Sequence, residues 1–192
     1  DRGAYLLATY GVFGIMGPAL FGFGVGLAIE RQNGWLALKQ VSPMPTGAYF
    51  FGKIAMSLCF GLAVVLLLSA AAVGFGKVQL AFSTWILLVA VLLLGTLPFC
   101  AIGLWIGTLV KGQAAVAIVN LVYLPMAVLS GLWIPLMAFP NIMQKAAVIW
   151  PSWHLSQLAL GVIGQLQGVR YGLHVFVLLA MTALFLALAA RR

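Results

Sequence analysis

The sequence predicts an all-α integral membrane protein, and three observations lead to this fold class. Hydrophobic residues fill 65% of the 192 positions and charged residues only 6%, whereas soluble domains average about 25% charged residues. The mean hydropathy is +1.18. The few charges stand singly between apolar stretches, and most of these are long enough for a helix of about 20 residues to cross the membrane. A chain of this length has room for about five such helices and for no separate soluble catalytic domain.

The stretches without charge divide the chain into five spans and two polar segments, which form one transmembrane domain over residues 1–192. The segment before the last span contains Pro151, Ser152, His154 and several glutamines, so it is too polar for a lipid-facing helix and is predicted to be re-entrant. The spans are expected at about 4–29, 54–75, 84–110, 114–133 and 171–190, a short helix at about 31–42, and the re-entrant segment at about 136–168.

Charge indicates the orientation. The net charge of +8 is typical of nucleic-acid binding only where basic residues cluster; here they stand at span ends, so no nucleic acid partner is expected.

Asp1 is not Met and leads directly into a span, so we expect upstream sequence, such as an earlier span. The positive-inside rule favours the larger of two basic groups as cytoplasmic: Arg31, Lys39, Lys53, Lys111, Arg191 and Arg192, against Arg2, Lys77, Lys145 and Arg170.

The polar connection between the first two spans is predicted to hold an amphipathic helix. Trp35, Leu38 and Val41 recur at a spacing of three residues and give one apolar stripe. Pro43 and Pro45 end the helix and turn the chain back toward the membrane. Such a helix at the cytoplasmic surface is a docking element or, alternatively, a plain linker between two spans.

Nucleotide chemistry is not predicted for this chain. The segment from Gly47 to Lys53 matches the GxxxxGK spacing of a phosphate-binding loop. However, Ile54 replaces the Ser or Thr that binds magnesium, and no strand precedes the segment. Lys53 is instead expected to reach the lipid headgroups at the membrane surface.

The sequence offers few of the residues that intramembrane hydrolysis, metal binding or proton coupling would need. Ser152 and His154 are the nearest pair for an intramembrane hydrolase, without a third partner. Asp1 and Glu30 are the only carboxylates, so neither a metal site nor a proton relay is expected within the spans. His154 and His174 are expected to bind backbone or water. The two cysteines, Cys59 and Cys100, are expected to be buried thiols.

Two stretches resemble the permease subunit of type-2 ABC exporters. The first begins with Glu30-Arg31 and runs through Gly34, Leu38-Lys39 and Ser42-Pro43-Met44 to Tyr49 and Gly52-Lys53. The second runs from Leu129 to Pro135 as Leu-Ser-Gly-Leu-Trp-Ile-Pro and continues with Phe139-Pro140 and Trp150-Pro151. The resemblance covers essentially the whole chain.

The resemblance implies a pair of permeases, alike or unlike, with two cytoplasmic ATPases docked on their coupling helices. Of the family's six spans, the first would be missing here. The coupling element would consist of Glu30, Arg31, Gly34, Trp35, Leu38 and Lys39. Glu30 would link movement of its span to the docking helix through a charge-assisted hydrogen bond; alternatively, it only marks the membrane boundary.

The resemblance also implies a substrate path between the two permeases. Its apolar, adaptable lining would be Phe13, Met16, Phe21, Phe23, Asn120, Tyr123 and Met126, although such residues also fill ordinary helix packing. An outer re-entrant hairpin would include Pro135, Pro140, Trp150 and Pro151. Two motifs, Gly22-x-x-x-Gly26 and Gly103-x-x-x-Gly107, permit close helix approach, and Pro18, Pro98 and Pro125 can kink their spans.

Together these expectations describe half of an exporter for a hydrophobic or amphipathic compound in the bacterial inner membrane, working by alternating access. The chain itself would be no enzyme and would bind no cofactor, because ATP and Mg²⁺ would be bound by the partner ATPase. A membrane scaffold, an ion-coupled carrier and an intramembrane hydrolase are the alternatives. The apolar lining does not distinguish a drug, an antibiotic, a lipid or a glycan as the cargo.

Overall fold

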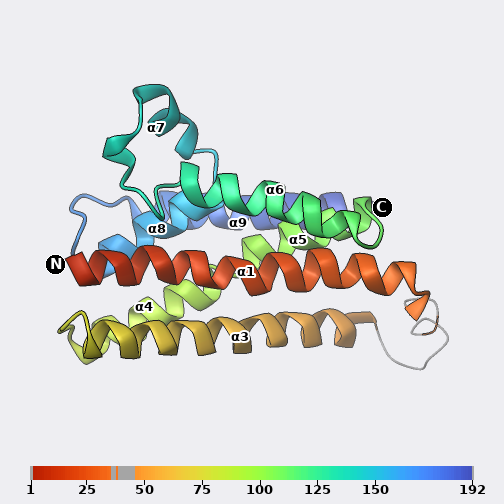
Figure 1. The fold of residues 1–192 in the computed structure, drawn as a ribbon, viewed down its shortest axis with the longest axis horizontal. Helices are drawn as coiled ribbons and strands as arrows, with labels where there is room; N and C mark the ends of the chain where they lie inside the picture. The colour runs from red at the N-terminus through yellow and green to blue at the C-terminus, as the bar shows by residue number, and fades with distance from the viewer. Residues whose placement is uncertain (1, 36–37, 39–45, 192) are drawn as a thin grey trace.

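The computed structural model describes residues 2–35, 38 and 46–191. All regular structure in these residues is helical, which confirms the predicted all-α class. The elements in chain order are α1 (Arg2–Gln32), α3 (Thr46–Gly74), α4 (Phe82–Leu94), α5 (Leu97–Leu109), α6 (Ala114–Leu129), η1 (Leu136–Ala138), α7 (Asn141–Ala147), α8 (Pro151–Val162) and α9 (Tyr171–Ala190) (Figure 1).

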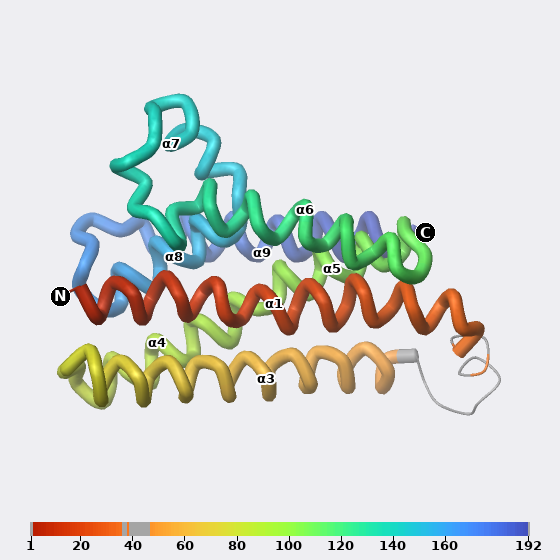
Figure 2. The backbone as a smooth tube through the Cα atoms, in the orientation of Figure 1, coloured from red at the N-terminus to blue at the C-terminus, as the bar shows by residue number. Residues whose placement is uncertain are grey.

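The long helix α1 lies at the centre of an elongated bundle. It packs against α3 on one side and against α5, α6 and α8 on the other (Figure 1). The two ends of the chain lie at opposite ends of the bundle (Figure 2). Four segments are long and apolar enough to cross a membrane: Arg2–Gln32, Gly47–Gly74, Phe82–Leu109 and Tyr171–Ala190; Ala114–Leu129 is a shorter apolar helix.

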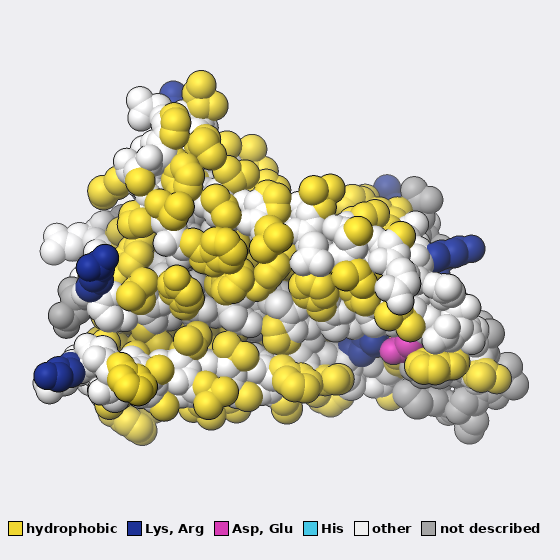
Figure 3. All heavy atoms as spheres, in the orientation of Figure 1, with side chains coloured by type: hydrophobic (Ala, Val, Ile, Leu, Met, Phe, Trp, Pro, Cys, Tyr) yellow, Lys and Arg dark blue, Asp and Glu magenta, His cyan; other side chains and the backbone are white. Residues whose placement is uncertain are grey.

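Charged side chains avoid the middle of the bundle. On the face shown in Figure 3, hydrophobic side chains cover the body, and Lys and Arg lie at the two ends and at the tip of the projecting segment around α7. We call the two ends the Arg2 end, where α1 starts, and the Glu30 end, where it finishes. This distribution suits a body surrounded by hydrocarbon with ends in the headgroup regions.

The span expected at about 84–110 is found at Phe82–Leu109, and it is bent near Pro98 into the two helices α4 and α5. The bend lies at Gly95 and Thr96, where the hydroxyl of Thr96 donates to the Leu92 carbonyl at 3.2 Å. Pro98 in the first turn of α5 has no N–H to continue the ladder. A Cβ on Gly95 would lie 2.3 Å from a methyl of Leu155 in α8. The bend and the glycine together leave room for α8 beside the span.

Other boundaries also differ from those expected. Helix α3 begins at Thr46 and not near 54, because Lys53 is paired inside the bundle and does not end the helix. Helix α6 ends at Leu129 and not near 133. Gly131 follows with φ of 76°, and the N–H of Leu132 donates back to the Ala127 carbonyl at 3.2 Å. This left-handed glycine is a typical helix stop.

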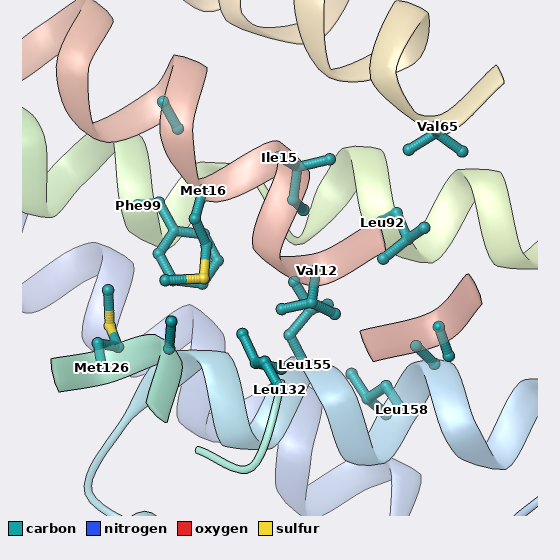
Figure 4. Packing of buried hydrophobic residues seen from close by; sticks show 14 of the residues in the cluster. Val12, Ile15, Met16, Val65, Leu92, Phe99, Met126, Leu132, Leu155 and Leu158 are labelled. Atoms are coloured by element: carbon teal, nitrogen blue, oxygen red, sulfur yellow. The ribbon is translucent and has the colours of Figure 1, made fainter. Parts of the chain in front are cut away.

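The hydrophobic core surrounds the middle of α1. Val12, Ile15 and Met16 are fully buried and lie among Leu92, Phe99 and Leu155 (Figure 4). Cys100 is buried as expected, whereas Cys59 is exposed on α3, which corrects the prediction that both thiols are buried.

Close contact between α1 and α5 depends on one of the two predicted glycine motifs. A Cβ on Gly103 would lie 2.9 Å from the Leu20 carbonyl oxygen, and one on Gly107 would lie 3.0 Å from the Gly24 carbonyl oxygen. The backbones therefore approach each other directly, as small residues permit. Gly22 and Gly26 instead face α3, at Ser57 and Lys53.

Between α6 and α9 the chain forms a projecting hairpin, residues 130–170. It leaves the bundle through η1 and α7, then returns as α8, which packs against α1, α4 and α9 (Figures 1 and 2). The polar residues Ser152, His154 and Ser156 of α8 are buried. They are covered by protein, which explains how so polar a helix lies in an apolar bundle.

Candidate functional site

The candidate site is the group of polar contacts around the last turn of α1, at the Glu30 end. One carboxylate oxygen of Glu30 pairs with the Lys53 ammonium at 3.0 Å, and the other accepts a hydrogen bond from the Tyr49 hydroxyl at 2.6 Å. The side chains of Glu30 and Lys53 are only 16% and 15% exposed. Tyr49 and Lys53 stand four residues apart on α3, so both reach the same carboxylate. The contacts join α1 to α3.

Lys53 is seated against the backbone of α1. Its ammonium also donates to the Gly22 carbonyl at 3.3 Å and lies 5.4 Å from the centre of the Tyr49 ring. A Cβ on Gly26 would lie 3.0 Å from the ammonium nitrogen. The lysine therefore does not reach out to the headgroups as predicted, and Gly26 makes the space that it occupies. We call Glu30, Tyr49 and Lys53 the Glu30 cluster.

Arg31, the next residue, contacts a different helix. Its guanidinium donates to the carbonyls of Gly107 and Thr108 in the last turn of α5, at 3.2 and 2.5 Å. Consecutive residues of α1 therefore bind α3 and α5. The sequence assigned Arg31 to docking and gave no sign of this contact, because nothing in the spacing pairs residue 31 with residue 107.

The remaining predicted coupling residues lie just beyond α1. Gly34 has φ of 72°, and the N–H of Leu38 donates to its carbonyl at 3.3 Å. Trp35 is 52% exposed and Leu38 70% exposed, so both present apolar surface just after the end of α1. Lys39 and half of the predicted short helix at 31–42 lie outside the described residues.

The predicted path residues divide into two groups. Phe13, Phe21 and Tyr123 are half-buried and in contact: the ring of Tyr123 stacks on Phe13 at 5.0 Å and meets the edge of Phe21 at 5.8 Å. Trp133, which the sequence did not single out for the path, packs on Phe13 at 5.2 Å and is 42% exposed. We call these four residues the aromatic cluster.

Three of the other path residues are buried, and Asn120 is half-buried. Met16 and Met126 are fully buried, and Phe23 is 2% exposed. Met16 and Phe23 face the core because α5 and α8 pack against α1, and Met126 is buried on α6. The amide of Asn120 donates to the Val116 carbonyl of its own helix at 3.0 Å.

In the projecting hairpin, the predicted prolines and tryptophan mark the starts of helices. Pro135, Pro140 and Trp150 immediately precede η1, α7 and α8, and Pro151 is the first residue of α8. Proline suits these positions because the first N–H groups of a helix have no intrahelical partner.

The two histidines bind each other, which corrects the expectation of backbone or water partners alone. The Nδ1 atoms of His154 and His174 lie 2.9 Å apart, and Nε2 of His154 lies 2.9 Å from the Val148 carbonyl oxygen. Burial lowers the pKa of His154 below its usual value, and the bond to Val148 opposes this shift.

Ser152 is engaged elsewhere. Its hydroxyl lies 2.5 Å from that of Ser130 and 3.4 Å from the Met126 carbonyl oxygen. Both the serine and the histidine of the predicted hydrolase pair are thus bound to other groups. Within the described ranges, no group of three or more His, Cys, Asp or Glu could hold a metal ion.

Known proteins resemble this chain over almost its whole length. The chain is 28% identical over 187 residues to a protein of Bacillus subtilis (strain 168) named "Putative transport permease YvfS"; the match covers 97% of this chain and 75% of the relative. The family model described as "ABC-2 family transporter protein" matches residues 3–191. Since this match spans nearly the whole chain, the protein belongs to the ABC-2 family of membrane transporters.

Proposed function

We propose that the chain is the permease half of an ATP-driven exporter that works by alternating access, with ATP and Mg²⁺ bound by a separate ATPase subunit. The family implies an ABC transporter system with an ATPase partner. We further propose that the permease pairs with a second copy, or with a related permease, in the bacterial inner membrane. The cargo proposed is a hydrophobic or amphipathic compound.

The Glu30 cluster is the single observation that carries this proposal. Its carboxylate joins α1 to α3 through Lys53 and Tyr49, in the last turn before the predicted docking segment. A charge pair that is mostly removed from water is sensitive to small displacements, because breaking it leaves two poorly solvated charges. A force applied to the segment after α1 would therefore act on α1 and, through the Glu30 cluster, on α3.

The charge distribution supports an external source of energy. Among the residues that the structure describes, Glu30 is the only acid, and it is neutralised by Lys53 at one end of the bundle. Carriers driven by protons usually place acidic residues in their spans. A permease driven through docking contacts needs no such relay.

The aromatic cluster supports an apolar cargo. Phe13, Phe21, Tyr123 and Trp133 form a partly exposed strip across α1, α6 and the start of the hairpin. Flat rings bind apolar and amphipathic molecules through burial and stacking. Asn120 and the Tyr123 hydroxyl, which lies 3.4 Å from the Phe13 carbonyl oxygen, add little polar selectivity.

The test is transport by proteoliposomes that contain the permease and its ATPase. The variant Glu30→Gln keeps the side-chain shape but removes the charge that pairs with Lys53. We expect ATP-dependent export of an amphipathic fluorescent dye to fall about tenfold, which corresponds to about 1.4 kcal/mol. Arg191→Gln is the control, because it removes an exposed charge at the same end of the bundle. Uphill transport by the permease without any ATPase would overturn the proposal.

A further inference from the structure

We infer that Arg31 is a positioning residue that passes movement of the segment after α1 to the turn between α5 and α6, and through this turn to α6. This inference rests on the proposed function, since it names the route by which docking would reach the aromatic cluster. This role differs from docking, because the Arg31 guanidinium donates to carbonyls of this chain and not to a partner protein.

The first step is the contact with α5. The last carbonyls of a helix have no intrahelical donors, and the helix dipole makes this end negative. Arg31 supplies both a donor and a positive charge to the carbonyls of Gly107 and Thr108. The guanidinium suits this place because its N–H groups are fixed in a rigid fork.

The second step is the fit of the following turn on α1. The N–H of Gly112 lies 3.4 Å from the Ala28 carbonyl oxygen. Gly112 has φ of 55°, and a Cβ there would lie 1.5 Å from the Oε1 atom of Gln32. Only glycine adopts this left-handed conformation without strain and leaves the space that the Gln32 side chain occupies. The turn therefore lies directly on the last turn of α1, next to the Arg31 contact.

The third step leads from the turn to the aromatic cluster. Helix α6 begins at Ala114, and the N–H of Ala115 donates to the Gly112 carbonyl at 3.1 Å. No flexible linker separates the turn from the helix. Tyr123 of α6 stacks on Phe13 of α1. A displacement of the end of α1 would thus move α3 through Glu30 and α6 through Arg31.

The experiment compares Arg31→Gln, Arg31→Lys and Gly112→Ala with the control Arg191→Gln, in the permease and in its complex with the ATPase. We expect Arg31→Gln to retain the same ratio of bound ATPase to permease but to lower the amount of dye exported per ATP hydrolysed about fivefold. Arg31→Lys should recover part of the loss, because it keeps the charge. Gly112→Ala should resemble Arg31→Gln, although it leaves every charge in place.

A second measurement needs no transport. In the permease alone, hydrogen exchange of the backbone amides at 109–116 should be faster in Arg31→Gln than in the wild type, with no change at the start of α3. Unchanged exchange at 109–116 would overturn the inference, whatever transport shows. Loss of the bound ATPase with normal export per ATP in the remaining complexes would also overturn it and assign Arg31 to docking. If wild-type transport did not depend on ATP, the proposed function would be overturned. The exchange result alone would then decide whether Arg31 holds the turn after α5.

Discussion

The Nδ1 atoms of His154 and His174 lie 2.9 Å apart and join the hairpin helix α8 to α9. Both side chains are buried, and the centre of the Trp153 ring lies 4.9 and 5.4 Å from the imidazole centres of His154 and His174. The Val148 carbonyl can only accept, so Nε2 of His154 carries a proton. In the neutral ring Nδ1 is then bare, and His174 donates to it.

This arrangement predicts that the hairpin loses stability in acid. The pKa of His154 is lowered by burial, so the unfolded state binds more protons than the folded state as the pH falls through about 6.5. The contribution is present above that pH and is lost below it, with a slope of at most about 1.4 kcal/mol per pH unit for each proton. A proton on Nδ1 of His154 would also break the bond to His174.

Unfolding midpoints of the detergent-solubilised protein between pH 8 and pH 5 would check this prediction. The double variant His154→Gln/His174→Gln is the control, because amides do not titrate in this range. We expect its midpoint to change less with pH than that of the wild type. Equal pH dependence in the two proteins would contradict the assignment, since other groups would then be responsible.

Tyr49→Phe is predicted to weaken the Glu30 cluster without removing a charge. The hydroxyl donates to a carboxylate at 2.6 Å, and hydrogen bonds to charged groups contribute about 1.5–3 kcal/mol. Because the cluster is partly solvated, we expect a loss near the lower value, about 1.5 kcal/mol. The free energy of unfolding in mixed micelles measures it. Tyr10→Phe, on the exposed side of α1, is the control and should change it little.

The sequence predicted the fold class and the family resemblance, and it singled out Glu30, because these depend on composition and local spacing. Charge-free stretches reveal helices, and Glu30 stands out among so few acids. The predicted end of α6 was wrong because the helix stops before Gly131, whose left-handed φ the sequence did not reveal. The span at 84–110 was placed correctly, but its bend leaves room for Leu155 of α8 beside Gly95, which local sequence does not show.

Tertiary contacts account for the other differences. His154 and His174 are 20 residues apart, and Arg31 and Gly107 are 76 apart. No periodicity connects such pairs, so single-sequence reasoning cannot assign their partners. Tyr49 and Lys53 are a partial exception, because their spacing of four residues on one helix favours a shared partner. Their shared partner is Glu30, and it reaches them only because α1 packs beside α3.

The aromatic cluster predicts a clear difference between two variants of Tyr123. Tyr123→Phe keeps both ring contacts and loses only a long hydrogen bond of 3.4 Å, so the free energy of unfolding should change by less than about 1 kcal/mol. Tyr123→Ala removes both ring contacts, each of which contributes about 0.5–1.5 kcal/mol beyond burial. The alanine variant should therefore lose about 3 kcal/mol or more. Similar losses in both variants would show that the hydroxyl, and not the ring, stabilises this face.

Gly103→Ala is predicted to separate α1 from α5. The added Cβ would lie 2.9 and 3.1 Å from the carbonyl oxygens of Leu20 and Ala19, which are backbone atoms that cannot rotate away. Relief requires the helices to shift, and overpacking of this kind costs about 1–3 kcal/mol. Because Gly107 lies one turn further along the same contact, movement at Gly103 should also loosen the carbonyls bound by Arg31.

Gly172→Ala is the matched control for this substitution, since nothing lies within 4 Å of the Cβ it would add to α9. Alanine favours a helix by roughly 0.5–1 kcal/mol over glycine, so this variant should be neutral or slightly more stable. Thermal unfolding of both variants in the same detergent compares the two effects directly. A Gly103→Ala variant as stable as Gly172→Ala would mean that α1 and α5 are not in backbone contact, and the proposed route from Arg31 to α6 would lose its support.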